Sequence, residues 1–319
     1  MSKVGSVGPA QHRASGDAAS LELPRRGFAM GLMVVSSIVI SFGGVTVRNI
    51  EQADPWQINF YRSLALMTAI LLILLFQYRG RTVEHVRGIG RAGILGGVLL
   101  SGAGIAFLQS LSHTTVANTL FIMCAIPFFA AGLARIFLKE RLQHATLITM
   151  IVAAGGILVM LAEGFGIGSA YGNLMALITA FCFASFAVIV RRNRQVDMLP
   201  TLLVSGTIIA LIALVVRWHD LGITLHDLLL CLLWGGVLSG FANWMFIVAA
   251  RHLLAAEVTL FMLLESALGP LWVWLFVGEV PTHWTLVGGA LVIAAVGIWA
   301  LIERGHSARK PPLPAPPNP

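Results

Sequence analysis

Residues 56–76 are WQINFYRSLALMTAILLILLF, and this stretch contains a single charged side chain, Arg62. A helix needs about 20 mainly apolar residues to cross the hydrocarbon core of a bilayer. The run therefore predicts a transmembrane helix, in which every backbone polar group is hydrogen-bonded internally. Similar runs follow one another along the chain with short connections, and together they predict ten spans: 27–47, 56–76, 92–112, 114–137, 144–162, 171–190, 198–216, 226–248, 254–277 and 284–302.

The composition of the whole chain agrees with this prediction. Of its 319 residues, 57% are hydrophobic and only 11% are charged. A soluble globular domain carries roughly 25% charged residues, so it could not hide this much apolar surface in one core. We expect an all-α integral membrane protein, with the lipid bilayer as its solvent.

Two other readings of the composition are disfavoured. The net charge of +7 could indicate a nucleic-acid-binding protein, but the cations are scattered between apolar runs instead of being gathered on one soluble face. The three cysteines, Cys124, Cys182 and Cys231, lie far apart inside apolar runs and match no metal-site spacing. We therefore expect no nucleic-acid partner, no metal and no cofactor.

The distribution of Lys and Arg predicts the orientation of the spans. Cytoplasmic loops of membrane proteins are enriched in these residues. With both termini in the cytoplasm, the outer side holds only Arg48 and Arg217, with Arg62 near the outer end of its helix, whereas the inner side holds Arg25, Arg26, Arg79, Arg81, Arg87, Arg91, Lys139, Arg141, Arg191, Arg192, Arg194, Arg251, Arg304, Arg309 and Lys310. We predict a multi-pass protein of a bacterial-type inner (plasma) membrane with both termini cytoplasmic.

The two ends of the chain have a different composition from the spans. Residues 1–26 are mostly small or polar and residues 303–319 end in a proline-rich tail, so neither can bury enough apolar area to fold. Both are predicted to be disordered. The first apolar run has full spanning length and no cleavage site behind it, which predicts a retained helix and not a signal peptide.

The chain also contains an internal repeat. A shift of 139 residues aligns Phe137, Glu140, His144, Thr146 and Leu147 with Phe276, Glu279, His283, Thr285 and Leu286. The repeat divides the chain into residues 27–162 and 163–302, with five predicted helices each. Because five is odd, the second half must enter the membrane from the opposite side, which predicts two inverted repeats.

Several short motifs resemble those of a known family. Ala125-Ile126-Pro127, followed by residues 137–141 (FLKER), resembles the end of the fourth helix in the EamA-type branch of the drug/metabolite transporter superfamily. Asn243-Trp244, Leu264-Glu265 and Val277-Gly278-Glu279 resemble its eighth and ninth helices. The resemblance implies a secondary transporter, usually an exporter of small metabolites, with a substrate cavity between the two repeats.

Glu265 and Arg62 are the clearest candidates for a substrate-binding or coupling role. An ionisable group at the centre of a membrane helix costs about 2.5 to 3.5 kcal/mol on insertion scales. Glu265 lies near the middle of its run, where it could carry a proton, face a cationic substrate, or simply fix helix packing through a hydrogen bond. Arg62 could bind a substrate carboxylate, pair with Glu265, or extend to the outer interface.

Uncharged polar residues complete the candidate site. Asn243, Trp244, Asn118 and Gln109 lie on helices that the resemblance places around the cavity, although packing between helices would explain each of them as well. Pro127 and Pro270 are expected to permit kinks at matching places in the two repeats.

Glu140 and Glu279 lie at helix ends, where we expect them to anchor loop structure and not to contact substrate.

These features predict a secondary transporter that exports a small polar or amphipathic metabolite by alternating access, with a proton as a candidate coupling ion. An uncoupled exchanger, a uniporter and a channel-like protein remain alternatives. An intramembrane enzyme is disfavoured because the spans contain neither HExxH nor GxSxG, nor a pair of aspartates.

Overall fold

The computed structural model describes residues 27–78, 80, 82–137, 139, 144–163, 167–193, 196, 198–250 and 255–307. Of the ends predicted to be disordered, residues 1–26 and 308–319 lie outside these residues, as does Glu140. Residues 303–307 of the predicted C-terminal tail instead belong to the last helix, which continues to Ser307. Within the described residues the regular structure is helical, which confirms the predicted all-α class. Apart from the first helix, over residues 27–41, the helices are α2 (Gly43–Arg48), α3 (Pro55–Tyr78), α4 (Thr82–Gly88), α5 (Gly90–His113), α6 (Val116–Met123), α7 (Ile126–Phe137), α8 (His144–Glu163), α9 (Ile167–Arg192), α10 (Thr201–Val216), α11 (Leu225–Leu232), η2 (Leu233–Phe241), α12 (Ala242–Ala250), α13 (Ala255–Val277) and α14 (His283–Ser307).

In the part of the chain that the structure describes, six helical segments are long and apolar enough to cross a membrane: Gly27–Arg48, Pro55–Tyr78, Gly90–His113, Val116–Phe137, Ala170–Val190 and Leu225–Met245. The other four predicted spans correspond to shorter apolar stretches, Ile148–Val159, Thr201–Val216, Leu264–Val277 and His283–Ala295. The protein is thus a multi-pass membrane protein, and the full count of ten spans stays a prediction.

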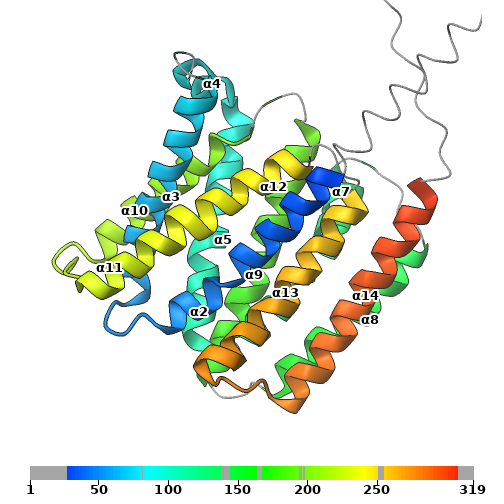
Figure 1. Ribbon diagram of the computed structural model, residues 1–319. Coiled ribbons are helices and arrows are strands. Elements are labelled where there is room, and N and C mark those ends of the chain that lie inside the picture. The colour runs from blue at the N-terminus through cyan, green and yellow to red at the C-terminus, as the bar shows by residue number, and fades with distance from the viewer. Residues whose placement is uncertain are drawn as a thin grey trace, which may run out of the picture.

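Three of these spans are not regular α-helices. The first is interrupted at Phe42, between residues 27–41 and α2. The fourth is interrupted at Cys124 and Ala125, between α6 and α7. The eighth continues as one rod in Figure 1, but its middle third, η2, is a π-helix. Irregular backbone at membrane depth is tolerated where protein surrounds it, and π-helical turns are frequent at functional sites.

The spans pack into a bundle in which segments far apart in the sequence lie side by side (Figure 1). Helix α8 packs along α14, α5 along α9, and α3 against both α10 and η2, while α2 and α6 pack against α13. A buried cluster that includes Leu108, Leu111, Val116, Trp234 and Val273 joins spans from both halves of the chain.

The outer surface of the bundle is apolar. Phe76, Ile151, Leu158 and Val215 are exposed on three different helices, α3, α8 and α10. Soluble monomers rarely expose contiguous apolar surface on this scale, and such a surface suits contact with acyl chains.

Candidate functional site

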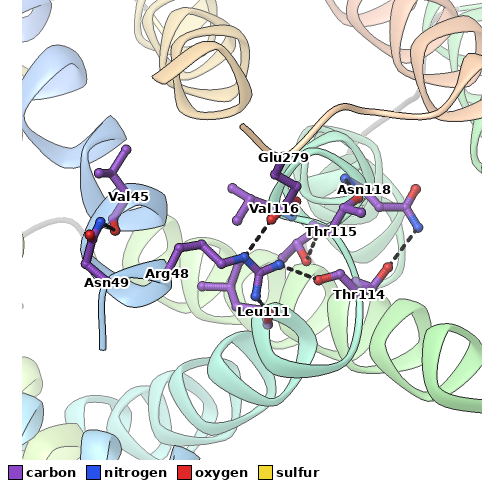
Figure 2. Close-up of polar contacts among 10 residues, drawn as sticks. Val45, Arg48, Asn49, Leu111, Thr114, Thr115, Val116, Asn118 and Glu279 are labelled. Atoms are coloured by element: carbon purple, nitrogen blue, oxygen red, sulfur yellow. Dashed lines mark hydrogen bonds and ion pairs between the residues drawn. The ribbon is translucent and has the colours of Figure 1, made fainter. Parts of the chain in front are cut away.

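One polar cluster joins the ends of four spans (Figure 2). Arg48 is the last residue of α2, and its Nε donates to Oε2 of Glu279 over 2.6 Å. The same guanidinium donates to the carbonyl oxygens of Leu111 at 2.7 Å and Thr114 at 2.8 Å, which are the free acceptors at the end of α5. The second carboxylate oxygen of Glu279 accepts from the backbone N–H of Val116 at 2.8 Å, at the start of α6. This geometry confirms that Glu279 anchors a helix end.

A pair of buried amides lies beside this cluster. Thr115 caps α6 by accepting from the backbone N–H of Asn118. The Asn118 side chain donates to Oδ1 of Asn173 on α9 and, at 3.3 Å, to Oγ1 of Thr114. Oδ1 of Asn118 and Nδ2 of Asn173 are buried with no hydrogen-bond partner in the described part of the chain. Asn118 was a sequence candidate, and Asn173 was not.

Arg62 lies one-third of the way along α3, and its guanidinium carbon is 4.6 Å from the ring centroid of Trp234 in η2. Its Nε is buried and has no acceptor among the described residues. The residue as a whole is half-buried, and its head packs over the buried indole of Trp234. Its role as a substrate-binding residue stays a prediction.

Asn59 lies one turn before Arg62 on α3 and was not a sequence candidate. Its side chain is fully buried, and neither amide atom has a partner in the described residues. Residues three apart share a helix face, so Asn59 and Arg62 face the same part of the bundle.

Glu265 lies on α13 and is half-buried. It is close enough to Cys124, at the interruption of the fourth span, to interact electrostatically with the thiol, and the neighbouring Ser266 shares a hydrogen bond with that thiol. Among the described residues no ion pair joins Glu265 to Arg62. The predicted pairing of the two charged candidates is therefore not present among the described residues.

The remaining amide and aromatic candidates make local contacts. Asn243 donates to the carbonyl oxygen of Ser239, one turn earlier in its own span, over 2.7 Å. Trp244 stacks on Phe241 with a centroid distance of 5.5 Å. Gln109 is buried on α5. These contacts fit helix packing, and a substrate role for the three residues stays a prediction.

The two helix-kink candidates differ in their surroundings. Pro127 is the second residue of α7, directly after the interruption at Cys124 and Ala125. Backbone N–H groups in the first turn of a helix have no partner inside the helix, so the missing N–H of proline costs nothing there. Pro270 lies inside α13, which continues as a helix on both sides of it. The interruption near Pro127 is therefore present, and a matching kink at Pro270 stays a prediction.

A buried carboxylate that the sequence analysis missed holds one of the loops. Asp227, in the first turn of α11, is fully buried and accepts from the backbone N–H groups of Glu51, Gln52 and Ala53 at 3.1, 3.0 and 2.9 Å. It ties the loop between the first two spans to the eighth.

Comparisons with known proteins agree with this architecture. The chain is 24% identical over 277 residues to the pseudopaline exporter CntI of Pseudomonas aeruginosa, covering 83% of this chain and 93% of that protein. It is 25% identical over 311 residues to human solute carrier family 35 member G1, covering 92% and 84% of the two chains. A probable terminal-alkyne amino-acid exporter of Streptantibioticus cattleyicolor is 28% identical over 208 residues, or 62% and 67% of the two chains.

A solved structure, described as the crystal structure of a protein, shares the fold with a TM-score of 0.65 at 16% identity, over 88% of this chain and 99% of that one. The EamA-like transporter family matches the chain twice, over residues 27–162 and again over residues 170–301. The two matches leave little of the helical bundle unassigned. The chain belongs to the EamA-like transporter family and is a multi-pass membrane transporter of a small-molecule substrate.

Proposed function

We propose that this protein exports a small polar or amphipathic metabolite across a bacterial-type inner membrane, by alternating access between two inverted repeats. Two of its relatives are named as exporters, one of pseudopaline and one of an amino acid. The observation that carries the proposal is the pair of half-buried charged side chains at the irregular spans: Arg62 against η2, and Glu265 in electrostatic reach of Cys124 in the interrupted fourth span. Transporter sites are typically built from discontinuous helices near the bilayer midplane.

The helix packing supports inverted repeats over residues 27–162 and 163–302. Exchanging each span of the first repeat for its counterpart in the second preserves four of the main packing contacts. The contacts of α3 with α10, α6 with α13 and α8 with α14 map onto themselves, and the contact of α5 with α10 maps onto that of η2 with α3. An inversion gives the two repeats opposite orientations, with both termini in the cytoplasm.

A proton is the coupling ion in this proposal, and Glu265 is its carrier. Its carboxyl lies mid-span next to the break between α6 and α7. No described cation forms an ion pair with it. A half-buried carboxyl group binds and releases protons with changes in its solvation, and alternating access supplies such changes.

The test is transport of labelled metabolites by the full chain in proteoliposomes, with and without an imposed pH gradient. Glu265→Gln is compared with wild type and with Glu84→Gln, which removes an exposed carboxylate on α4. We expect gradient-driven transport in wild type and Glu84→Gln, and loss of the gradient dependence in Glu265→Gln.

Other outcomes separate the alternatives. Gradient dependence that persists in Glu265→Gln contradicts its role as the proton carrier. Transport in wild type that ignores the gradient indicates a uniporter or an exchanger, and flux that does not saturate with substrate concentration indicates a channel-like protein.

A further inference from the structure

The side-chain amide of Asn59 has no hydrogen-bond partner among the described residues. The side chain is fully buried in the membrane-spanning part of α3, with both Nδ2 and Oδ1 unbonded among the described residues. Buried polar groups in proteins are almost always hydrogen-bonded, because an unmade bond in an apolar surrounding is destabilising. An orphaned amide at this depth indicates that its partner is something other than the described chain.

Arg62 presents the same problem with a full charge. It lies one turn along the same face, its Nε has no acceptor, and no described carboxylate forms an ion pair with it. A buried charge is stable only when it is paired, and Arg is the side chain best suited to bind a carboxylate through two parallel hydrogen bonds.

The indole of Trp234 and the backbones of neighbouring helices lie close to the Arg62 guanidinium. A Cβ at Gly235 in η2 would lie 2.1 Å from the backbone oxygen of Arg62, so only glycine permits this approach of η2 to α3. The preceding residue, Trp234, packs its indole under the guanidinium. Gly43 of α2 lies beside the same indole, where a Cβ would come within 2.8 Å of its Nε1. A Cβ at Gly104 of α5 would lie 3.6 Å from Nη2 of Arg62. Four spans therefore meet at the cation.

We infer that Asn59, Arg62 and Trp234 form an intramembrane site for the carboxylate group of the transported solute. Arg62 binds both carboxylate oxygens, Asn59 donates a further hydrogen bond through Nδ2, and Trp234 holds the guanidinium plane by cation–π contact. The bound anion neutralises the one described cation inside α3. This inference rests on the proposed transport function and adds the substrate class, organic carboxylates.

The test measures binding separately from transport. Purified full-length protein in detergent micelles is titrated with matched pairs of compounds, each a carboxylate and the alcohol or amide that replaces it: L-norleucine with L-norleucinol, L-phenylalanine with L-phenylalaninamide, and succinate with succinamide. Inorganic phosphate is a further probe, because an arginine could equally bind a phosphoryl anion. The readout is the ligand-dependent rise in the melting temperature, from which Kd is obtained.

The variants are Arg62→Lys, which keeps the charge and so the fold but loses the planar fork, and Trp234→Phe, which keeps an aromatic ring. The control is Arg217→Lys, at an ion pair with Asp54 outside the site. We expect at least one carboxylate to bind wild type and Arg217→Lys, with its neutral partner binding at least about tenfold more weakly, and Arg62→Lys to raise the carboxylate Kd by about tenfold or more.

The inference is overturned if no carboxylate binds, if the neutral partners bind as tightly, if phosphate alone binds, or if Arg62→Lys leaves Kd unchanged. Transport of some solute in the proteoliposome assay with any of these results would leave the proposed function standing without this site. Absence of all transport would contradict the proposed function itself.

Discussion

Arg48 Nε lies 2.6 Å from Oε2 of Glu279, although 231 residues separate them in the sequence. The ion pair joins the end of the first span to the segment that follows α13, and the carboxylate also holds the backbone N–H of Val116. A single carboxylate therefore links both predicted repeats at one side of the bundle.

Replacing Glu279 with glutamine is expected to lower the free energy of unfolding by about 1–3 kcal/mol. Arg48 and Val116 donate to different oxygens of the carboxylate, and in glutamine one of these two positions is an NH2 group, which is a donor. The measurement is unfolding of the micellar protein by titration with a denaturing detergent. Arg48→Gln and the double variant complete a mutant cycle. Effects of the two single changes that simply add would contradict an energetic link between these side chains.

Gly235→Ala is expected to destabilise the protein by about 1–3 kcal/mol through overpacking, since its new Cβ would meet the backbone oxygen of Arg62 at 2.1 Å. Gly236→Ala is the matched control, because the nearest atoms to its Cβ, in Ala65, are 3.8 and 4.0 Å away. Melting temperatures of the two variants give the comparison. Equal values would show that η2 does not depend on a close approach to α3.

Asp227→Asn is expected to cost about 1–3 kcal/mol of stability, because the amide brings a donor to a position where three backbone N–H groups need acceptors. Asp220→Asn provides the control, since that side chain is exposed. Proteolysis of the loop between the first two spans should increase only in Asp227→Asn. Unchanged cleavage would mean that other contacts hold the loop.

The predicted orientation can be tested with single cysteines at Gly80 and Gly222, which are exposed and have open space or ordinary contacts around them. The native Cys124, Cys182 and Cys231 are first replaced by alanine. A membrane-impermeant maleimide is expected to label Gly222→Cys in intact cells and Gly80→Cys only in inside-out vesicles. The reverse pattern would place both termini outside.

The apolar runs of the sequence predicted the helices well. The run 56–76 became α3, Pro55–Tyr78, and the run 92–112 became α5, Gly90–His113. Hydropathy identifies such segments because each must be apolar over the thickness of a bilayer. It contains no information on the hydrogen-bond pattern inside a run, so the interruption at Phe42 and the π-helix within 226–248 were not predicted.

The candidate site was predicted less completely, for a related reason. Arg62 and Glu265 stood out because a charge in a membrane helix is unusual, whereas Asn59 carries no charge and lies in a helix start rich in polar and aromatic residues. Its significance comes from the absence of a described partner, which is a property of the packed bundle. The local contacts of Asn243 and Trp244 also depend on packing, and the letters of the sequence could not distinguish them from cavity-lining residues.

The π-helix in the eighth span changes which residues before and after it lie on the same face of the helix. Each bond of a π-helix spans five residues instead of four, and one additional residue in an α-helix turns everything after it by about 100°. An ordinary α-helical wheel therefore gives a wrong angle between Cys231, which precedes η2, and Asn243, which follows it. Deleting one residue within Leu233–Phe241 would restore α-helical phase, and Trp234 and Asn243 could then no longer keep their present angular relationship.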